Sequence, residues 1–180
     1  QAWGLTETAP FATYLPAELT YAKAGSCGIP MPYTEVRIVD PATGSDVAER
    51  GSTGEMWVKG PNVTPGYWHD ASATEAAFSD GWFRSGDIGY QDEDGFFYIV
   101  DRLKDMIISG GENISSIEVE DALCRHPAVL AAAVVARPDP KWGETPCAFV
   151  ELKEGCSLQH DDLLAHCDGL LARYKMPRTV

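Results

Sequence analysis

Short β-like runs separated by turn residues fill the chain from residue 28 to residue 100, and they constrain the fold more than any other feature. The runs are Val36–Val39, Glu55–Val58, Ile88–Tyr90 and Phe96–Val100. Asp-Gly pairs at 80–81 and 94–95 are typical of tight hairpin turns. One helix is expected between the strands, because Ser72-Ala-Thr-Glu75 has the pattern of a capping box and residues 76–78 continue it. The pattern predicts a small β-rich subdomain with the character of a distorted barrel.

The pattern changes to mixed α/β after Asp101 and Arg102. A short apolar strand is expected at 106–108, and a helix from the capping box at Ser115 to about Arg125. We therefore divide the chain at about residue 101 and predict an α+β protein with two parts, 1–101 and 102–180.

The later half of the second part is expected to hold two strands and one helix. Apolar runs at 129–136 and 146–152 predict buried strands. The helix is expected from about Ser157 to Tyr174. Its predicted buried stripe is Leu163, Leu164, Cys167, Leu170, Leu171 and Tyr174.

The charge balance limits the partners. The sequence has 27 acidic and 14 basic residues, a formal charge of −13 at pH 7, which repels nucleic acid and anionic lipid. No apolar run approaches the roughly 20 residues of a membrane span, and the first residues have neither the basic start nor the apolar stretch of a signal peptide. We therefore expect a cytoplasmic protein without nucleic-acid partners. The sequence does not indicate an oligomeric state.

Cysteine and histidine positions do not indicate a metal site. The five cysteines include no C-x-x-C pair, and an odd number cannot all pair within the chain. Free, buried thiols are expected at these positions, and structural roles for the four histidines.

The first candidate functional segment is Trp3-Gly-Leu-Thr-Glu-Thr8. Trp3 offers a ring on which a base could stack, Thr6 a hydroxyl for a phosphate, and Glu7 a carboxylate for magnesium. A surface turn is the alternative explanation for this segment.

The second and third candidates are a turn aspartate and a charged boundary. Asp87 follows a glycine turn and could accept two hydrogen bonds from the vicinal diol of a ribose. Arg102 could bind a ribose or phosphate oxygen through its planar fork, and Lys104 lies where a hinge could absorb a change of dihedral angles. An ordinary turn and a solvated linker are the alternatives.

The fourth candidate is the glycine pair Gly110-Gly111. Two residues without Cβ let a ligand or another backbone approach closely, and the pantetheine arm of coenzyme A is thin enough for such a passage. A plain turn explains two glycines equally well.

These segments occur in one order, and in that order the chain resembles the adenylate-forming superfamily of acyl- and aryl-CoA ligases, luciferases and peptide-synthetase adenylation domains. The matching stretches are Trp3-Gly-Leu-Thr-Glu7, residues 52–68, Gly81-Trp-Phe-Arg-Ser-Gly-Asp87 and residues 101–114, leading into Glu118-Val-Glu120. The resemblance covers nearly the whole chain. Residues 110–118 and 142–150 look most like short- to medium-chain fatty-acyl or related carboxylate CoA ligases.

The resemblance implies ATP or AMP, Mg²⁺ and coenzyme A as ligands, and a small-molecule carboxylic acid as substrate. It implies that Trp3 flanks the adenine, Thr6 contacts a phosphate and Glu7 binds magnesium. It further implies that Asp87 and Arg102 bind the ribose, that Lys104 is the hinge, and that Gly110 and Gly111 line the CoA path. Residues 1–101 would be the end of a large N-terminal domain, and residues 102–180 a mobile C-terminal lid domain.

Several departures accompany the resemblance. Ser85 stands where threonine is usual, and Ala2 where glycine is frequent. The family's Ser/Thr/Gly-rich phosphate loop does not occur. The segment from Lys175 to Val180 matches the stretch that precedes the family's catalytic lysine, so that lysine is expected beyond Val180. The chain is thus expected to be a C-terminal piece of the enzyme, inactive by itself. An adenylation domain that feeds a carrier protein, or a non-catalytic module with the same fold, are the alternatives.

Overall fold

The computed structural model describes residues 1–180 and separates them into two compact units, Gln1–Leu103 and Lys104–Val180. The first unit is β-rich and the second mixes helices with strands, which confirms the mixed α/β class in its coarse form. The boundary predicted from the sequence, at about residue 101, lies two residues before the boundary between the two units at Leu103.

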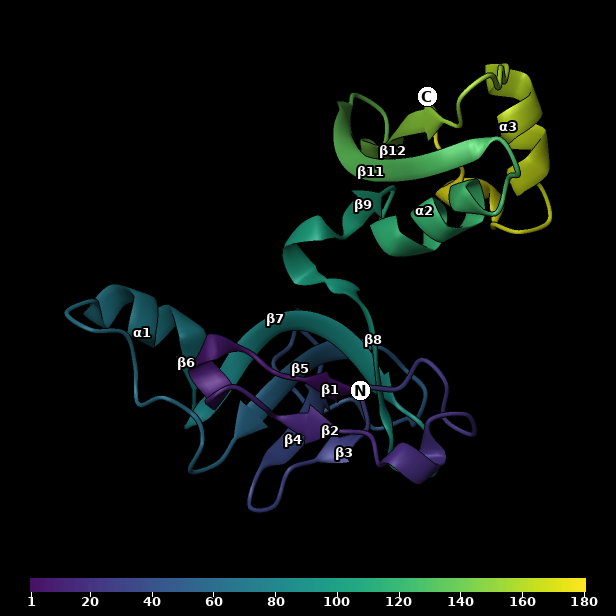
Figure 1. The fold of residues 1–180 in the computed structure, drawn as a ribbon. Helices are drawn as coiled ribbons and strands as arrows, with labels where there is room; N and C mark the ends of the chain where they lie inside the picture. The colour runs from purple at the N-terminus through teal and green to yellow at the C-terminus, as the bar shows by residue number, and fades with distance from the viewer. The chain divides into compact units, whose positions relative to one another are not determined.

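The first unit is built on a five-stranded antiparallel sheet. Its strands are β4 (Glu35–Val39), β5 (Gly54–Lys59), β6 (Phe78–Ser79), β7 (Trp82–Gln91) and β8 (Phe97–Arg102). β7 pairs with β5, β6 and β8, and it bends along its length in Figure 1. Gly89 allows this arrangement, because a Cβ there would lie 2.5 Å from both Met56 Sδ and Tyr98 O. The four strand predictions in this unit are confirmed.

A smaller sheet and short helices complete the first unit. The sheet contains β1 (Ala2–Trp3), β2 (Thr13–Tyr14) and β3 (Ile29–Pro30). The helices are the 3-10 turns η1 (Thr6–Thr8) and η2 (Ala17–Leu19) and the α-helix α1 (Ala71–Ala77), while η3 (Leu103–Asp105) crosses the division between the units. The core of the unit combines residues from both sheets: Trp3, Ala12, Cys27, Ile38, Met56, Val58 and Phe97.

In the first unit the predicted turn at Asp80-Gly81 is confirmed, but the predicted helix cap at Ser72 is not. Asp80 and Gly81 have φ angles of 49° and 78°, as a two-residue hairpin requires. The predicted cap at Ser72 is wrong: α1 begins after Asp70, because Asp70 Oδ1 accepts a hydrogen bond from Ala73 N at 2.8 Å. Phe78, expected to continue the helix, begins β6.

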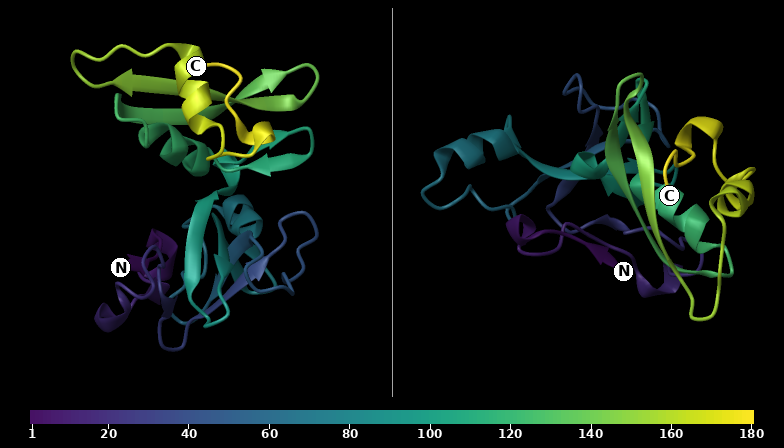
Figure 2. Two further views of the ribbon diagram at one scale, coloured as in Figure 1. Left: turned by 90° about the vertical axis from the view of Figure 1, so that its right-hand side faces the viewer. Right: turned by 90° about the horizontal axis from the view of Figure 1, so that it is seen from above.

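The second unit is a four-stranded sheet with two helices. Its elements are β9 (Ile107–Ser109), β10 (Glu112–Ile114), α2 (Ser116–Cys124), β11 (Val129–Asp139), β12 (Gly143–Leu152), α3 (His160–Cys167) and η4 (Arg173–Lys175). The sheet order is β10-β9-β12-β11, and the long antiparallel pair β11 and β12 is visible in both views of Figure 2. Ser115 caps α2 by accepting from Glu118 N at 3.3 Å, as predicted.

Two predictions for the second unit are wrong in part. β11 and β12 are strands but are not fully buried: Leu130 is 58% exposed and Phe149 63%, because helices α2 and α3 share a core with only one face of the sheet. α3 is shorter than the predicted 157–174 helix, since the chain leaves it at Asp168 and turns at Gly169 with a φ of 89°.

The end of α3 changes which side chains are buried. Leu163, Cys167 and Leu171 are buried, as the predicted stripe requires. Leu164 is only half-buried. Leu170 and Tyr174 are 43% and 46% exposed, and both lie beyond the end of α3. The five cysteines are free, as expected, although Cys124 and Cys156 are exposed. None of the helices combines the length and apolar character that crossing a membrane requires.

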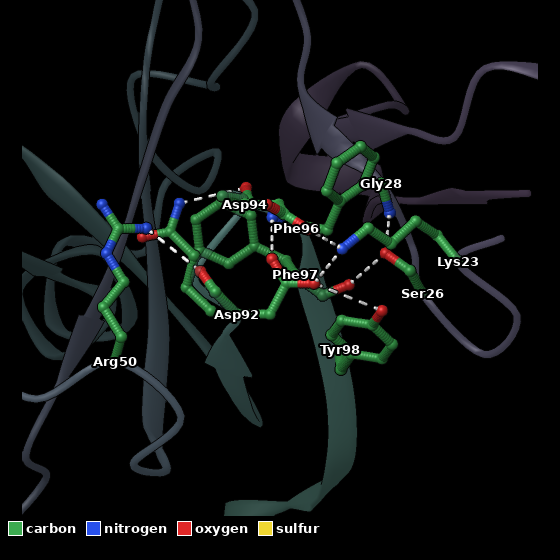
Figure 3. A network of polar contacts seen from close by, with 11 residues as sticks. Lys23, Ser26, Gly28, Arg50, Asp92, Asp94, Phe96, Phe97 and Tyr98 are labelled. Atoms are coloured by element: carbon green, nitrogen blue, oxygen red, sulfur yellow. Dashed lines mark hydrogen bonds and ion pairs between the residues drawn. The ribbon is translucent and has the colours of Figure 1, made fainter. Parts of the chain in front are cut away.

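A network of polar contacts joins the Lys23 region to the β7–β8 hairpin (Figure 3). Lys23 Nζ lies 2.8 Å from Asp92 Oδ2 and 2.5 Å from Asp94 Oδ2. Hydrogen bonds to these carboxylates raise the pKa of Lys23 above its ordinary 10.5. Burial pushes the pKa of Asp92 upward, but hydrogen bonds from Lys23 and Phe96 N outweigh it, so this pKa lies below its ordinary 3.8.

We expect Lys23→Met to lower the thermal unfolding midpoint by a few degrees near neutral pH. The depressed pKa of Asp92 contributes stability above about 3.8 that is lost as pH falls through the folded-state value. The raised pKa of Lys23 contributes stability below 10.5 that is lost as pH rises through its folded-state value. The difference between wild type and variant should therefore be constant between these limits and shrink in acid. Lys23→Arg is the control that keeps the charge, and a difference that grows in acid would contradict this account.

Candidate functional site

The candidate site in the first unit is organised around the carboxylate of Asp87. Trp3 Nε1 donates a hydrogen bond to Asp87 Oδ2 at 2.8 Å, and Arg102 Nε lies 3.3 Å from Asp87 Oδ1. Trp3 and Asp87 are both 6% exposed, whereas the Arg102 side chain is 60% exposed. The structure thus brings together three residues that the sequence analysis proposed separately.

Strand pairing explains how these residues meet. Asp87 and Arg102 are direct partners in the antiparallel register of β7 and β8. Trp3 lies in β1, whose partner is β2, and its ring joins the core of the unit. Ser85 Oγ accepts a hydrogen bond from Asp87 N at 3.0 Å, so the residue that replaces the usual threonine fixes the backbone of the turn. The three side chains are therefore oriented by backbone pairing and packing.

The arrangement leaves Asp87 able to accept further hydrogen bonds. A carboxylate has about four acceptor positions on its two oxygens, and Trp3 and Arg102 each use one of the oxygens. A fixed carboxylate with spare acceptors suits the two hydroxyls of a vicinal diol.

The loop with Thr6 and Glu7 is stabilised from within and by residues 62–67. Thr8 is fully buried, accepts from Leu5 N at 2.9 Å and donates to Pro10 O at 2.8 Å. The hydroxyl of Tyr67 donates to Glu7 Oε1 at 2.8 Å, and Thr64 N donates to Glu7 O at 2.8 Å. Thr6 is exposed and Glu7 is half-buried.

Asn62 and Tyr67 are site residues that the sequence analysis did not single out. Asn62 Nδ2 donates to the carbonyl oxygens of Thr8 and Phe11 at 3.0 Å each. The segment 52–68 was noted for its resemblance, yet nothing in its spacing indicated that its end contacts the first loop. The sequence offered one indication only: residues 52–68 and the first loop both belong to the stretches that resemble the adenylate-forming superfamily.

Burial and charge shift two pKa values near the site. Burial, followed by the negative charge of Asp87, raises the pKa of the Cys27 thiol against opposing hydrogen bonds. The hydrogen bond to Glu7 raises the pKa of Tyr67. Cys27 is therefore a protonated thiol at neutral pH, and Tyr67 remains a donor to Glu7.

Metal ligands do not cluster in this chain: no group of three or more His, Cys, Asp or Glu side chains could hold a metal ion. Magnesium is usually bound through one or two carboxylates, with water and substrate phosphates supplying the remaining oxygens. The half-buried carboxylate of Glu7 fits that kind of partial coordination.

Gly110 and Gly111, in the second unit, form the two-residue turn between β9 and β10. Ser109 and Glu112 are partners on either side of it, and the glycines have φ angles of 62° and 90°. Trp142 packs on the turn: Gly110 N donates to Trp142 O at 2.8 Å, and a Cβ at Gly110 would lie 2.7 Å from Trp142 Cε3. A hairpin turn and a close side-chain approach thus explain both glycines. Their contact with coenzyme A stays a prediction.

Lys104, the expected hinge residue, lies in η3 and is exposed. None of the three residues of this turn is buried. The hinge role of Lys104 and the ligand roles of Thr6, Glu7 and Arg102 stay predictions. Trp3 has little exposed surface for stacking, and its observed contact is with Asp87; its role beside an adenine likewise stays a prediction.

Two family models match the chain. The model for AMP-binding enzyme matches residues 1–68, and that for the AMP-binding enzyme C-terminal domain matches residues 118–180.

Similar curated proteins match the chain along its whole length. A feruloyl-CoA synthase from Amycolatopsis is 46% identical over 180 residues, which are 100% of this chain and 36% of that protein. A 2-succinylbenzoate–CoA ligase from Bacillus velezensis is 47% identical over 177 residues, 98% of this chain and 35% of that protein. The chain thus spans about a third of the length of these relatives.

A similar solved structure is o-succinylbenzoate CoA synthetase from Bacillus subtilis in complex with its acyl-adenylate intermediate. It is 42% identical, with a TM-score of 0.90, over 99% of this chain and 36% of that one. The same enzyme in complex with ATP and magnesium ion has a TM-score of 0.88 and 41% identity, over 99% and 36% of the two chains.

We expect Gly110→Ala to destabilise the second unit by about 1–3 kcal/mol, because the new methyl group meets both an unfavourable φ and the ring of Trp142. Gly111→Ala is the matched control, since it has a positive φ but open space around it. Denaturant unfolding of the single variants, and of Gly110→Ala combined with Trp142→Ala, measures the clash. If the double variant loses the sum of the two single losses, Trp142 is not the cause.

Proposed function

The chain belongs to the AMP-binding enzyme family, and from this premise we propose that it is part of an ATP-dependent acyl-CoA ligase. The observation that carries the proposal is the buried carboxylate of Asp87, oriented by Trp3 and Arg102. The comparisons support the proposal, because the similar proteins are named as CoA synthases or CoA ligases. The chain spans about a third of the length of those relatives. The proposed activity is therefore that of a full-length ligase of which this chain is a part.

The proposed reaction has two steps. A carboxylate oxygen of the acid attacks the α-phosphorus of ATP, the bond from that phosphorus to the bridging oxygen breaks, and pyrophosphate leaves. The thiolate sulfur of coenzyme A then attacks the acyl carbon, the bond from that carbon to the phosphate oxygen breaks, and AMP leaves. Positioning and charge neutralisation supply most of the rate in chemistry of this type.

Within this reaction we assign roles to the residues of the first unit. Asp87 accepts hydrogen bonds from the ribose hydroxyls, and Arg102 supports the same sugar with the part of its fork that does not face Asp87. Thr6 contacts a phosphate. Trp3 flanks the adenine, and its indole N–H orients Asp87. Glu7 would bind magnesium, which neutralises phosphate charge when bound.

In the second unit we propose a mobile lid with Lys104 as its hinge. Each unit has its own buried core, and the turn that contains Lys104 buries none of its residues. A segment without buried side chains can change its dihedral angles at little cost in packing. Gly110 and Gly111 would line the path of coenzyme A in the pose that forms the thioester.

The acid substrate is proposed to be aromatic. Several relatives are named for aromatic acids: feruloyl-CoA synthase, 2-succinylbenzoate–CoA ligase and indoleacetate–CoA ligase. These names favour an aryl carboxylic acid over the short- to medium-chain fatty acid indicated by the sequence resemblance. They also favour coenzyme A over a carrier protein as the acyl acceptor.

We expect Asp87→Ala to reduce kcat/KM for ATP in the full-length ligase by roughly 30- to 1000-fold, which corresponds to about 2–4 kcal/mol from two charge-assisted hydrogen bonds. Selectivity for ATP over 2′-deoxy-ATP should fall in the same variant. Asp46→Ala removes an exposed aspartate of the same unit and should leave both values unchanged. Unaltered ATP kinetics in Asp87→Ala would refute the ribose assignment.

We expect Lys104→Pro to affect the two half-reactions unequally, because proline fixes φ in the turn where the rotation is proposed. Pyrophosphate exchange reports the first half-reaction, and thioester formation from a preformed acyl-adenylate reports the second. Lys104→Ala removes the side chain but leaves the backbone free, so it separates the two causes. Equal loss of both half-reactions in Lys104→Pro would count against a hinge at this position.

A further inference from the structure

Glu55 is a buried carboxylate beside the turn that carries Asp87. It lies in β5 and is 2% exposed. Its Oε2 accepts from Trp57 Nε1 at 2.7 Å, and its Oε1 accepts from Gly86 N at 3.0 Å. Arg84 Nε lies 3.7 Å from Oε2. A buried carboxylate is costly unless hydrogen bonds and charge compensate it, and here the compensation comes from Trp57 and from the stretch of β7 just before Asp87.

The backbone of β7 is irregular at this point. Glu55 pairs with Ile88 and Trp57 pairs with Arg84, so residues 85–87 of β7 lie opposite Met56 alone. Gly86 has a φ of 73°. A bulge of this kind removes backbone groups from the regular ladder of hydrogen bonds. Glu55 Oε1 supplies the acceptor for Gly86 N that the neighbouring strand would otherwise provide.

We propose that Glu55 is a positioning residue for the ribose contact, acting through the bulge at residues 85–87. The inference rests on the proposed role of Asp87. Gly86 immediately precedes Asp87. A shift of the Gly86 backbone would therefore change the backbone orientation of Asp87 and with it the direction of the Asp87 carboxylate. The contacts of that carboxylate with Trp3 and Arg102, at 2.8 and 3.3 Å, depend on this orientation. The contacts of Glu55 are with Trp57, Gly86 and Arg84, so its proposed effect on the ribose passes through the backbone next to Asp87.

The test is Glu55→Gln in the full-length ligase. A glutamine has the same shape, but its amide offers one acceptor oxygen and an NH₂ group, so Trp57 Nε1 or Gly86 N loses its partner. We expect KM for ATP to rise about tenfold, with a smaller change in kcat and in KM for coenzyme A. Selectivity for ATP over 2′-deoxy-ATP should fall toward that of Asp87→Ala. Equilibrium dialysis of AMP against 2′-deoxy-AMP measures the same selectivity without turnover.

Two controls separate positioning from general destabilisation. Lys23→Met removes ion pairs elsewhere in the same unit and should lower the unfolding midpoint without altering ribose selectivity. Trp57→Phe removes one hydrogen-bond donor to Glu55 but leaves the Glu55 carboxylate in place. It should lower the selectivity for ATP over 2′-deoxy-ATP by a smaller factor than Glu55→Gln does. Trp57→Phe also decides the question if Glu55→Gln does not fold.

The outcomes distinguish the inference from the proposed function. If Asp87→Ala loses ribose selectivity but folded Glu55→Gln keeps it, and Trp57→Phe keeps it as well, Glu55 has no positioning role. If Asp87→Ala itself keeps the selectivity, the ribose assignment fails instead. Loss of selectivity in Asp87→Ala and Glu55→Gln, with Lys23→Met unchanged, supports the inference.

Discussion

The buried carboxylate of Asp87 links the first strand of the first unit to its last two strands. Removing a carboxylate from water is unfavourable unless donors replace the lost hydration. One donor is the indole of Trp3, 84 positions earlier in the chain, and the other is Arg102 on the neighbouring strand. The charge is compensated only when the first strand is packed into the core and β7 and β8 pair in this register. The contacts that orient the candidate site are therefore also contacts that stabilise the fold.

The second unit follows a different principle, in which packing rather than charge sets the geometry. Its core combines α2, α3 and one face of the sheet, and its first hairpin is fixed where Trp142 lies against Gly110. Because each unit has a core of its own, the free energy of folding of each is determined largely inside it. The mobile lid proposed for the second unit requires such independence.

Local chemistry explains what could be predicted from the sequence. The Asp80-Gly81 turn and the Ser115 cap depend on neighbouring residues alone, and both were predicted correctly. The helix predicted to reach Tyr174 failed because apolar periodicity continues past Gly169, where the backbone has already turned. The contacts of Glu55 and Asn62 could not be predicted, since they depend on a bulge and on a loop approach that no local pattern encodes.

The geometry at Asp87 also accounts for how one arginine could serve both the protein and a ligand. The ion pair uses only Nε of Arg102, and a guanidinium carries five N–H donors in a planar fork. The ion pair does not involve the two terminal nitrogens, and the side chain is 60% exposed. Trp3, by contrast, has one N–H and uses it on Asp87, so its polar contribution is committed to orientation. Of these three residues, the arginine is thus the one whose donors are not all used in orienting Asp87, and the proposed contact with a sugar at Asp87 requires such donors.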